Sequence, residues 1–491
     1  MEVRLNEANF EYDIHSLIKA FYPQEDVHVT VEETGVDYSG FKVFYPQGVK
    51  DNCLELFYYE CGKEISKTTC VINSADRGAT KNILKQQLYS LLAEVTGKEL
   101  PWGTLTGIRP TKIAMTMLDE GAHTEQIRTY MKQTYYASDD KIALCCEIAK
   151  REREIMSRLH GEQGFSLYVG IPFCPTTCLY CSFTSYPIAK WAARVEDYLS
   201  ALEREIDLVA EVYQDRILDT VYIGGGTPTT LSPEQLERLI TYIKSKFDFE
   251  KGPVREFTVE AGRPDSITED KLETLYRNGV TRISINPQTM NEETLKVIGR
   301  RHTIADVIQS FQLARKIGFD NINMDFILGL PGEVQTPGEY GKIIHSMEEM
   351  KKLSPDSITV HSMAIKRAAG MHQWLAEHAE VQSINTPEMM EIAAQAASDL
   401  GMEPYYLYRQ KNMAGNFENV GYAREGKEGI YNILIMEEKQ SIAAVGAGTI
   451  SKVVLPEGRI ERCDNVKDIT LYLEKIDDIL DKKKKFYAIM A

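Results

Sequence analysis

Leu167–Phe183 reads LYVGIPFCPTTCLYCSF, and its main feature is a group of three cysteines. Cys174, Cys178 and Cys181 have the spacing C-x3-C-x2-C and follow a short apolar run that is typical of a buried strand. Thiolates are the usual ligands of iron–sulfur clusters, and three of them can bind three irons of a cubane and leave the fourth iron open. A structural zinc site needs a fourth ligand, and no suitable Cys or His follows nearby. The spacing therefore predicts a [4Fe–4S] cluster.

The bulk composition is that of an ordinary globular protein. Of the 491 residues, 43% are hydrophobic and 26% are charged. The net charge of −16 disfavours general binding to phosphate backbones, so no nucleic-acid partner is expected. No apolar run reaches the roughly 20 residues of a membrane span, and MEVRLNEANFEYDIH at the N-terminus does not resemble a signal peptide. We therefore expect a cytoplasmic protein whose nine cysteines stay reduced.

The remaining cysteines and a lysine run show no pattern of their own. Cys145 and Cys146 are neighbours in a helical stretch and face different ways, so we interpret them as buried core. The same interpretation extends to the isolated cysteines, which are Cys53, Cys61, Cys70 and Cys463. Lys482–Lys485 is the obvious basic patch. Because it follows the helical stretch LYLEKIDDILD, we interpret it as a solvated helix end.

Three regions differ in their pattern of elements. Residues 1–160 mix strand-like runs (VHVTVEE, FKVFY, LELFYYE) with helical stretches, which predicts an α+β N-terminal domain. Its segment PWGTLTGIRPTKI (Pro101–Ile113) predicts an ordered loop that either meets substrate or joins domains. Residues 161–368 alternate strands with amphipathic helices, which predicts an α/β fold with parallel strands in a partial barrel or an open sheet. Residues 369–491 start with a helix, continue with β-like stretches (GIYNILIMEE, SIAAVGAG) and end in the lysine-rich helix, which predicts a small C-terminal domain.

Polar residues and glycines mark the strands of the central region. The strand candidates are SLYVGIP, DTVYIGG, REFTVEA, TRISINP, NINMDFI and DSITVHS. In barrel-type α/β folds the site gathers at the carboxyl ends of the strands. The cysteines follow the first strand, and the groups at the next five are Gly224–Pro228, Glu260, Gln288, Asp325, and His361 with Ala364. This succession predicts a ligand site at that edge.

Together these motifs resemble the radical S-adenosylmethionine (SAM) superfamily. Within it, the chain resembles the oxygen-independent coproporphyrinogen III oxidase group, and most closely its HemZ-type branch. The matching strings, in the order of the family, are LYVGIPFCPTTCLYCSF, IGGGTPTTL, VEAGRPD, RISINPQTM, IGRRH, NMDFILGLPGE and LSPDSITVHSMA. The resemblance spans roughly residues 165 to 450. It implies a partial (β/α)6 TIM-like barrel, with a [4Fe–4S] cluster and SAM as cofactors. SAM chelates the open iron, and one electron from the cluster cleaves it to a 5′-deoxyadenosyl radical.

The resemblance also implies roles for individual residues. The cluster ligands would be Cys174, Cys178 and Cys181. The residues that would contact SAM are Tyr168, Tyr180, Gly225, Gly226, Thr227, Glu260, Gln288, Arg300, Asp325 and Ala364. The candidate catalytic residues among them are Tyr168, Arg300 and Asp325. A guanidinium can pair a carboxylate bidentately, which suits Arg300 to the carboxylate of SAM.

The chain departs from the family pattern at two positions. The oxidative decarboxylases carry another cysteine where this chain has Phe183. They also carry a histidine two places after the strand tyrosine, where this chain has Gly170. Both positions lie close to the expected substrate, so the departures concern the reaction and leave the cluster and SAM residues unchanged.

Three functions fit the resemblance. The first is oxidative decarboxylation of coproporphyrinogen III to protoporphyrinogen IX in heme biosynthesis, and the others are heme transfer by a chaperone and radical-dependent modification or degradation of heme. Gly170 and Phe183 favour the last two. In each case the partner is a tetrapyrrole, and a flavodoxin or ferredoxin-type electron donor is implied. Basic candidates for the tetrapyrrole carboxylates are Arg301, Lys366, Arg367, Arg409 and Lys411.

Overall fold

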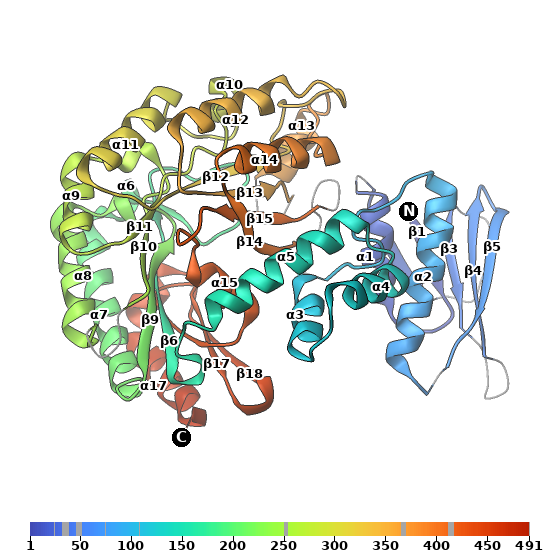
Figure 1. The fold of residues 1–491 in the computed structure, drawn as a ribbon, viewed down its shortest axis with the longest axis horizontal. Coiled ribbons are helices and arrows are strands. Elements are labelled where there is room, and N and C mark those ends of the chain that lie inside the picture. Colours follow the sequence, from blue (N-terminus) through green and yellow to red (C-terminus); the bar gives the residue numbers. More distant parts are fainter. Residues whose placement is uncertain are drawn as a thin grey trace. The chain divides into compact units, whose positions relative to one another are not determined.

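The protein was studied as a computed structural model that describes residues 1–23, 25–31, 39–45, 52–73, 75–107, 109–249, 254–364, 370–410 and 417–490 (Figure 1). The chain divides into two compact units. The first comprises Met1–Lys150 with Leu407–Glu418, and the second comprises Arg151–Tyr406 with Asn419–Ala491. The predicted domain boundaries at residues 160 and 368 stay a prediction.

The first unit is built on a five-stranded mixed sheet. Its strands are β2 (His28–Val31), β1 (Glu2–Leu5), β3 (Gly40–Phe44), β4 (Cys53–Glu60) and β5 (Lys63–Val71), in that order. Helices α1 (Glu11–Phe21) and α2 (Arg77–Thr96) pack on it, with Leu5, Leu17 and Leu88 in the common core. Helices α3 (Thr111–Asp119), α4 (Thr124–Tyr135) and α5 (Asp139–Met156) follow. The α+β pattern predicted for this region is confirmed.

The Pro101–Ile113 segment holds a distant part of the chain within the first unit. The indole of Trp102 is fully buried and donates to Glu418 Oε2 over 2.7 Å. Lys141 forms an ion pair with the same carboxylate. Gly103 has φ +52°, and a Cβ there would meet the carbonyl oxygen of Tyr135 at 2.0 Å, so only glycine fits. These contacts hold the segment in place within the first unit, and its role as a substrate contact or as a connection between domains stays a prediction.

The second unit contains an eleven-stranded sheet whose central part is the predicted partial barrel. Six parallel strands lie side by side in chain order, namely β6 (Gly164–Ile171), β9 (Ile217–Gly225), β10 (Glu256–Glu260), β11 (Arg282–Ser284), β12 (Ile322–Leu328) and β13 (Ser357–Ser362). Their residues are buried on both faces, as expected for parallel strands covered by helices. All six predicted strands and the α/β fold class are confirmed.

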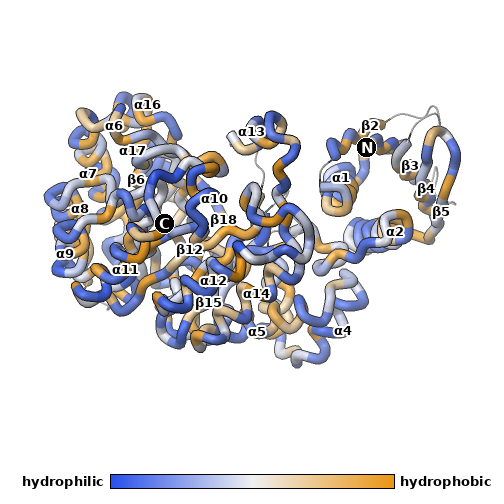
Figure 2. Tube along the Cα trace, turned by 90° about the horizontal axis from the view of Figure 1, so that it is seen from above, coloured by the Kyte–Doolittle hydropathy of each residue, from blue (hydrophilic) through white to orange (hydrophobic). Residues whose placement is uncertain are grey.

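The crossover helices surround these strands (Figure 1). They are α7 (Val195–Val212), α8 (Pro233–Lys246), α9 (Glu269–Arg277), α10 (Glu292–Val297), α11 (Ile304–Ile317) and α12 (Gly341–Leu353). Hydrophobic and hydrophilic stretches alternate along the outer helices (Figure 2), because each buries only one face. Capping boxes at Ser232 and Thr303 fix the starts of α8 and α11.

The C-terminal residues extend the barrel sheet at both edges. At one edge, β15 (Asn419–Ala423) pairs antiparallel with β13, and β14 (Glu403–Tyr408) lies outside it. At the other edge, β16 (Ser441–Val445) pairs parallel with β6, and β17 (Ile450–Val454) and β18 (Ile460–Asp464) follow. The remaining elements are β7 (Phe173–Cys174), β8 (Tyr186–Pro187), α6 (Ile188–Trp191), α13 (Met371–Glu377), α14 (Pro387–Asp399), α15 (Ile430–Glu437), α16 (Ile469–Glu474) and α17 (Ile476–Tyr487).

Three local predictions were wrong. The stretch GIYNILIMEE is not β-like but forms α15, whose residues Tyr431, Ile433 and Leu434 are buried. A short, mostly apolar run has no clear period that separates a buried helix from a strand. Cys61 is not core but exposed, at the turn between β4 and β5. Lys483, in the run interpreted as solvated, is 1% exposed.

Candidate functional site

The three cysteines lie on one loop at the carboxyl end of β6. We call residues 172–187 the cysteine loop. Cys174 is buried, and Cys178 and Cys181 are half-buried. Within the loop, the N–H of Cys181 donates to the carbonyl of Cys178 over 3.1 Å, and the N–H of Leu179 donates to the carbonyl of Ile298 over 3.0 Å. The sequence prediction that these thiols share one site is consistent with this placement.

Burial favours the protonated form of two of the three thiols, Cys174 and Cys181, in the protein alone. Burial raises the pKa of Cys174 to about 11, and the other two cysteines add to the effect. Burial also raises the pKa of Cys181. A bound metal would reverse this, because coordination deprotonates thiols. Among the described residues, no three His, Cys, Asp or Glu side chains converge on a single metal ion. Three cysteines that each bind a different iron of a cubane do not need to converge in that way.

Two donors reach the sulfur atoms from neighbouring strand ends. Thr227 Oγ1 donates to Cys174 Sγ over 3.5 Å. Arg263, only 3% exposed, directs Nη1 at Cys178 Sγ over 3.7 Å and at the carbonyl of Thr176 over 3.0 Å. Asp265 pairs with the same guanidinium at 2.7 Å. Arg263 was not predicted as a site residue, although it lies in the VEAGRPD motif three residues beyond a strand end.

The glycine run at the end of β9 packs against the start of the cysteine loop. Gly225 has φ +110°, in the region that favours glycine. A Cβ on Gly226 would lie 2.6 Å from the carbonyl oxygen of Phe173, so a side chain there has no room. The N–H groups of Gly226 and Thr227 donate to the carbonyls of Ile171 and Phe173 over 2.8 and 2.7 Å. The predicted glycines therefore fix the base of the loop.

Glu260 lies at the end of β10 beside a stack of tyrosines. Its carboxyl group accepts from the hydroxyl of Tyr222 over 2.5 Å and from the N–H of Gly225 over 3.2 Å. Tyr222 stacks on Tyr431 of α15 with ring centroids 4.5 Å apart, and Tyr168 stacks on both. Burial raises the pKa of Glu260 to about 7, and the charge of Asp325 adds to this. Glu260 therefore titrates near neutral pH.

Asp325 on β12 stays ionised. Burial alone would raise its pKa, but hydrogen bonds from His361 and Asn323 outweigh burial and hold the pKa below its ordinary value. Asn323 Nδ2 lies 2.7 Å from Asp325 Oδ1, and His361 Nε2 lies 3.8 Å from Oδ2. Glu260 and Asp325 are thus two nearby carboxyl groups whose pKa values are driven apart, an arrangement that is frequent at functional sites.

Gln288 combines backbone strain with an unpaired amide oxygen. It is 8% exposed and has φ +70°, which is uncommon for a residue with a side chain. Its N–H donates to the carbonyl of Asp325 over 3.0 Å, and its carbonyl accepts from Ile327 over 2.9 Å. Oε1 has no hydrogen-bond partner among the described residues. A buried group of this kind fits a site that completes its hydrogen bonds with a ligand.

Arg300 links the cysteine loop to the same edge. It is 7% exposed, hydrogen-bonds Tyr180 and Cys178, and donates from Nη1 to the carbonyl of Asn286. Nε has no partner in the described part of the chain. His302 beside it is also buried, and both of its ring nitrogens lack a partner there. Burial lowers the pKa of His302 to about 4, with Arg300 adding to the effect, so the ring is neutral.

The structure thus connects nearly all of the predicted site residues. Contacts that are direct or pass through Tyr222 join eight of these residues to each other or to the cysteine loop, namely Tyr168, Tyr180, Gly225, Thr227, Glu260, Gln288, Arg300 and Asp325. Ala364 lies half-buried just beyond β13. Three features fit an iron–sulfur cluster with a small polar ligand. They are the unpaired polar atoms of Gln288 and Arg300, the close packing of the glycine run against the loop, and the three thiols.

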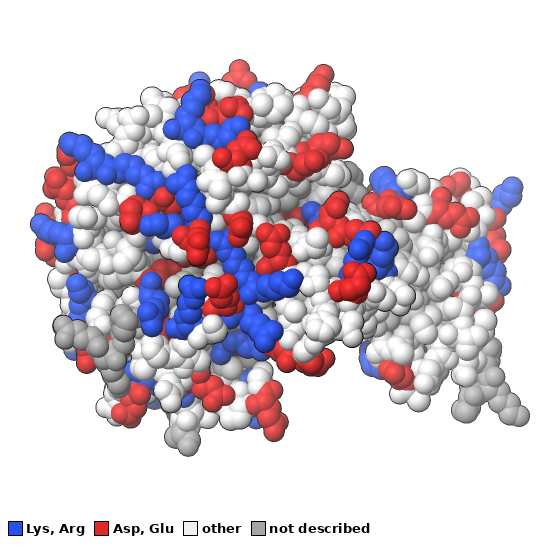
Figure 3. All heavy atoms as spheres, in the orientation of Figure 1, with Lys and Arg blue, Asp and Glu red and all other residues white. Residues whose placement is uncertain are grey.

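The basic residues expected to meet a tetrapyrrole fall into three groups. Arg301 is exposed. The expectation that Arg409 binds a tetrapyrrole carboxylate does not fit its position. Its side chain is 4% exposed, lies over the ring of Trp102 and donates to the carbonyl of Leu105. Lys366, Arg367 and Lys411 lie outside the described residues. On the face shown in Figure 3, basic and acidic side chains are interspersed. Among the described helices, none is long and apolar enough to cross a membrane.

Comparison with known proteins identifies relatives over most of the chain. Residues 168–339 match the radical SAM superfamily. The chain is 42% identical over 410 residues to the oxygen-independent coproporphyrinogen-III oxidase-like protein HemZ of Bacillus subtilis (strain 168), a match that covers 83% of this chain and 81% of that protein. It is 34% identical over 287 residues to the heme chaperone HemW of the same organism, covering 58% and 69%. The solved coproporphyrinogen III oxidase (HemN) from Escherichia coli, a radical SAM enzyme, matches with a TM-score of 0.49 and 22% identity, covering 65% and 70%.

Proposed function

This chain belongs to the radical SAM superfamily, in the group of oxygen-independent coproporphyrinogen III oxidase-like proteins, and we propose that it is an enzyme that acts on a tetrapyrrole. Its cofactors are a [4Fe–4S] cluster and SAM, which together supply a 5′-deoxyadenosyl radical when bound. The observation that carries the proposal is the cysteine loop at the carboxyl end of β6, with the unpaired groups of Gln288 and Arg300 beside it.

In this proposal, Cys174, Cys178 and Cys181 bind the cluster. Arg263 and Thr227 stabilise the negative sulfur atoms by donating to them. Arg300 and Gln288 hold polar groups of SAM with their unpaired atoms. The remaining SAM contacts are Tyr168, Tyr180, Gly225, Gly226, Thr227, Glu260, Asp325 and Ala364. Ionised Asp325 and titrating Glu260 would accept hydrogen bonds from SAM hydroxyl or ammonium groups.

The proposed reaction is oxidative decarboxylation of coproporphyrinogen III. Each of two propionate side chains would lose a hydrogen atom to the 5′-deoxyadenosyl group, which becomes 5′-deoxyadenosine, and would then lose CO2 and pass one electron to an external electron acceptor, so that a vinyl group remains. Phe183 on the cysteine loop is 72% exposed, so its ring could offer apolar contact to the pyrrole rings of a substrate beside the cysteines. The electron donor to the cluster would be a flavodoxin or ferredoxin, and the protein would work in the cytoplasm.

One observation favours heme transfer as a second candidate. A Cβ on Gly170 would lie 2.5 Å from Thr449 Cγ2, so a side chain at this position requires Thr449 to move. The histidine that the resemblance places here in the decarboxylases therefore does not fit beside Thr449 as it stands. With Phe183 in place of a cysteine, the loop carries one thiol fewer and one exposed apolar ring more. An apolar ring here suits contact with a bound heme.

The two functions differ in a direct assay. We expect the reconstituted, reduced protein to release CO2 from coproporphyrinogen III in the presence of SAM under anaerobic conditions. Release should stop when SAM is omitted or when Cys178 is replaced by Ala. Absence of CO2 together with stoichiometric binding of added heme, measured by its absorption spectrum, would replace the enzyme proposal with heme transfer. A changed heme mass would instead indicate heme modification.

Binding of SAM should depend on pH through Glu260. Its raised pKa of about 7 means that the carboxyl is neutral below pH 7 and ionised above it. Only the ionised form accepts charge-assisted hydrogen bonds, so the Kd for SAM should fall about tenfold from pH 6 to pH 8. Glu260→Gln should flatten this profile. Glu333→Gln is the control, because Glu333 also has a pKa raised to about 7 by burial but hydrogen-bonds Thr289. Equal profiles for wild type and Glu260→Gln would contradict the role of Glu260.

A further inference from the structure

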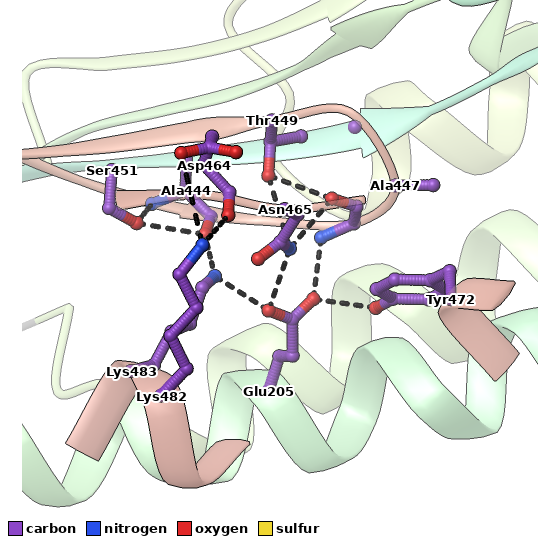
Figure 4. Close-up of polar contacts among 12 residues, drawn as sticks. Glu205, Ala444, Ala447, Thr449, Ser451, Asp464, Asn465, Tyr472, Lys482 and Lys483 are labelled. Atoms are coloured by element: carbon purple, nitrogen blue, oxygen red, sulfur yellow. Dashed lines mark hydrogen bonds and ion pairs between the residues drawn. The ribbon is translucent and has the colours of Figure 1, made fainter. Parts of the chain in front are cut away.

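A buried ion pair connects the C-terminal helix to the first crossover helix of the barrel. Glu205 on α7 and Lys483 on α17 lie 2.6 Å apart, and at most 1% of either side chain is exposed (Figure 4). The ammonium of Lys483 also donates to the carbonyl of Ala444 on β16. Charges are rarely buried in this way unless every partner is satisfied, since their desolvation is costly.

Glu205 is fully satisfied by four donors from different elements. Oε1 accepts from Lys483 Nζ and, over 2.9 Å, from Asn465 Nδ2. Oε2 accepts from the hydroxyl of Tyr472 over 2.5 Å and from the backbone N–H of Gly446 over 2.7 Å. Figure 4 shows the carboxylate between the helices and the turn that follows β16. A buried ion pair adds little net stability. Its directional hydrogen bonds to this turn therefore indicate a role in holding the position of the turn.

The turn of residues 446–449 lies against the end of β6 and against the cysteine loop. Since β16 pairs parallel with β6, the turn and the loop leave the sheet at the same edge. A Cβ on Gly446 would lie 2.5 Å from the carbonyl oxygen of Gly170, which precedes the loop. A Cβ on Gly448 would lie 2.9 Å from Thr184 Oγ1, which follows the third cysteine. The turn is therefore tightly packed, and neither glycine has room for a side chain.

Tyr198 makes the connection rigid from the helix side. Its ring is fully buried on α7, as is Glu205. The hydroxyl donates to the carbonyl of Gly170 over 2.7 Å and accepts from the N–H of Ala447 over 3.0 Å. Helix α7 thus fixes the position of the turn relative to the end of β6 through Tyr198. Lys483 holds the carboxylate of Glu205 in place.

We propose that Glu205 and Lys483 are positioning residues that set the geometry of the cysteine loop through the 446–449 turn. Neither side chain contacts the loop itself. Their loss shifts the turn against Gly170 and Thr184, which displaces the cysteines relative to the groups on the other strand ends. The reaction is sensitive to such displacements, because small errors in position cost large factors in rate.

The first test compares Glu205→Gln with Glu438→Gln. Glu438 is also buried and ion-paired, to Lys452 and Arg462, but it precedes β16 and so lies at the opposite end of that strand. We expect Glu205→Gln to change the EPR spectrum of the reduced cluster and its response to SAM, and to lower kcat for SAM cleavage about tenfold. Glu438→Gln, at a similar loss of Tm, should leave both unchanged. Equal spectra and rates in the two variants would overturn the proposal.

The second test needs no change in the buried pair and keeps the proposal falsifiable if Glu205→Gln fails to fold. Gly448 and Gly458 both have φ +73°, so alanine introduces the same backbone strain at each. A Cβ added to Gly448 would lie within 4 Å of Thr184, whereas a Cβ added to Gly458 would have no neighbour within 4 Å. Gly448→Ala should reproduce the altered EPR spectrum and the slower cleavage, whereas Gly458→Ala should not. Wild-type behaviour of folded Gly448→Ala would contradict the coupling between turn and loop.

Discussion

Replacing Cys178 by alanine is expected to abolish cluster assembly and SAM cleavage together. The side chain is one of three thiols on the cysteine loop, and two guanidinium groups, of Arg263 and Arg300, approach it. Loss of a supporting group around a metal typically costs 10–100-fold, so loss of a ligand should cost more than about 100-fold. Iron and sulfide content after anaerobic reconstitution, and 5′-deoxyadenosine release under reduction, measure the two effects.

Cys146→Ala is the matched control for this variant. Cys146 is equally small and 2% exposed, but it lies on α5 and not on the cysteine loop. The variant should cost some stability, because removal of a buried sulfur atom leaves a small cavity. Iron content and SAM cleavage should stay at wild-type values. Full cluster content in Cys178→Ala, or loss of the cluster in Cys146→Ala, would contradict the assignment of the ligands.

The sequence was sufficient to predict the barrel and the edge where the site lies. The six strands alternate with amphipathic helices, and such a pattern allows few topologies, because parallel strands need right-handed crossovers. The carboxyl ends of parallel strands meet at one edge, so Glu260, Gln288 and Asp325 could be placed together before any contact was known. The strained backbone of Gln288 could not be predicted, because β12 imposes it through two backbone hydrogen bonds.

Other parts of the site depend on contacts that leave no local pattern. Arg263 approaches the cysteines because it follows β10, and its place in the VEAGRPD motif does not by itself show that the side chain turns toward the cysteine loop. Tyr431 joins Tyr168 and Tyr222 only because α15 packs against the barrel strands, and this run was interpreted as β-like. Lys483 sits in a run of four lysines, and only the burial of its partner Glu205, far away in the sequence, distinguishes it.

The second large effect is expected at Arg263, whose guanidinium is buried against the cysteine loop. Arg263→Gln removes the donor to Cys178 Sγ and to the carbonyl of Thr176, and it leaves Asp265 without its partner. Hydrogen bonds and positive charge near the sulfurs raise the potential of an iron–sulfur cluster, so their loss should lower it. A hydrogen bond to a charged group contributes about 1.5–3 kcal/mol, which corresponds to a decrease of roughly 60–130 mV for one electron.

In the single variant the unpaired carboxylate of Asp265 would itself lower the potential of the cluster. The decisive variant is therefore Arg263→Gln with Asp265→Asn. The double variant removes both charges and keeps the local net charge constant, which leaves the lost donor as the main difference. Its midpoint potential, from an EPR-monitored titration, should still lie below that of wild type, and cleavage of SAM should slow because the cluster is harder to reduce. Arg277→Gln with Glu237→Gln breaks an exposed pair of the same kind on α9 and α8 and should leave the potential unchanged. A double variant at Arg263 and Asp265 with the wild-type potential would mean that the guanidinium only secures the loop to β10 and does not tune the cluster.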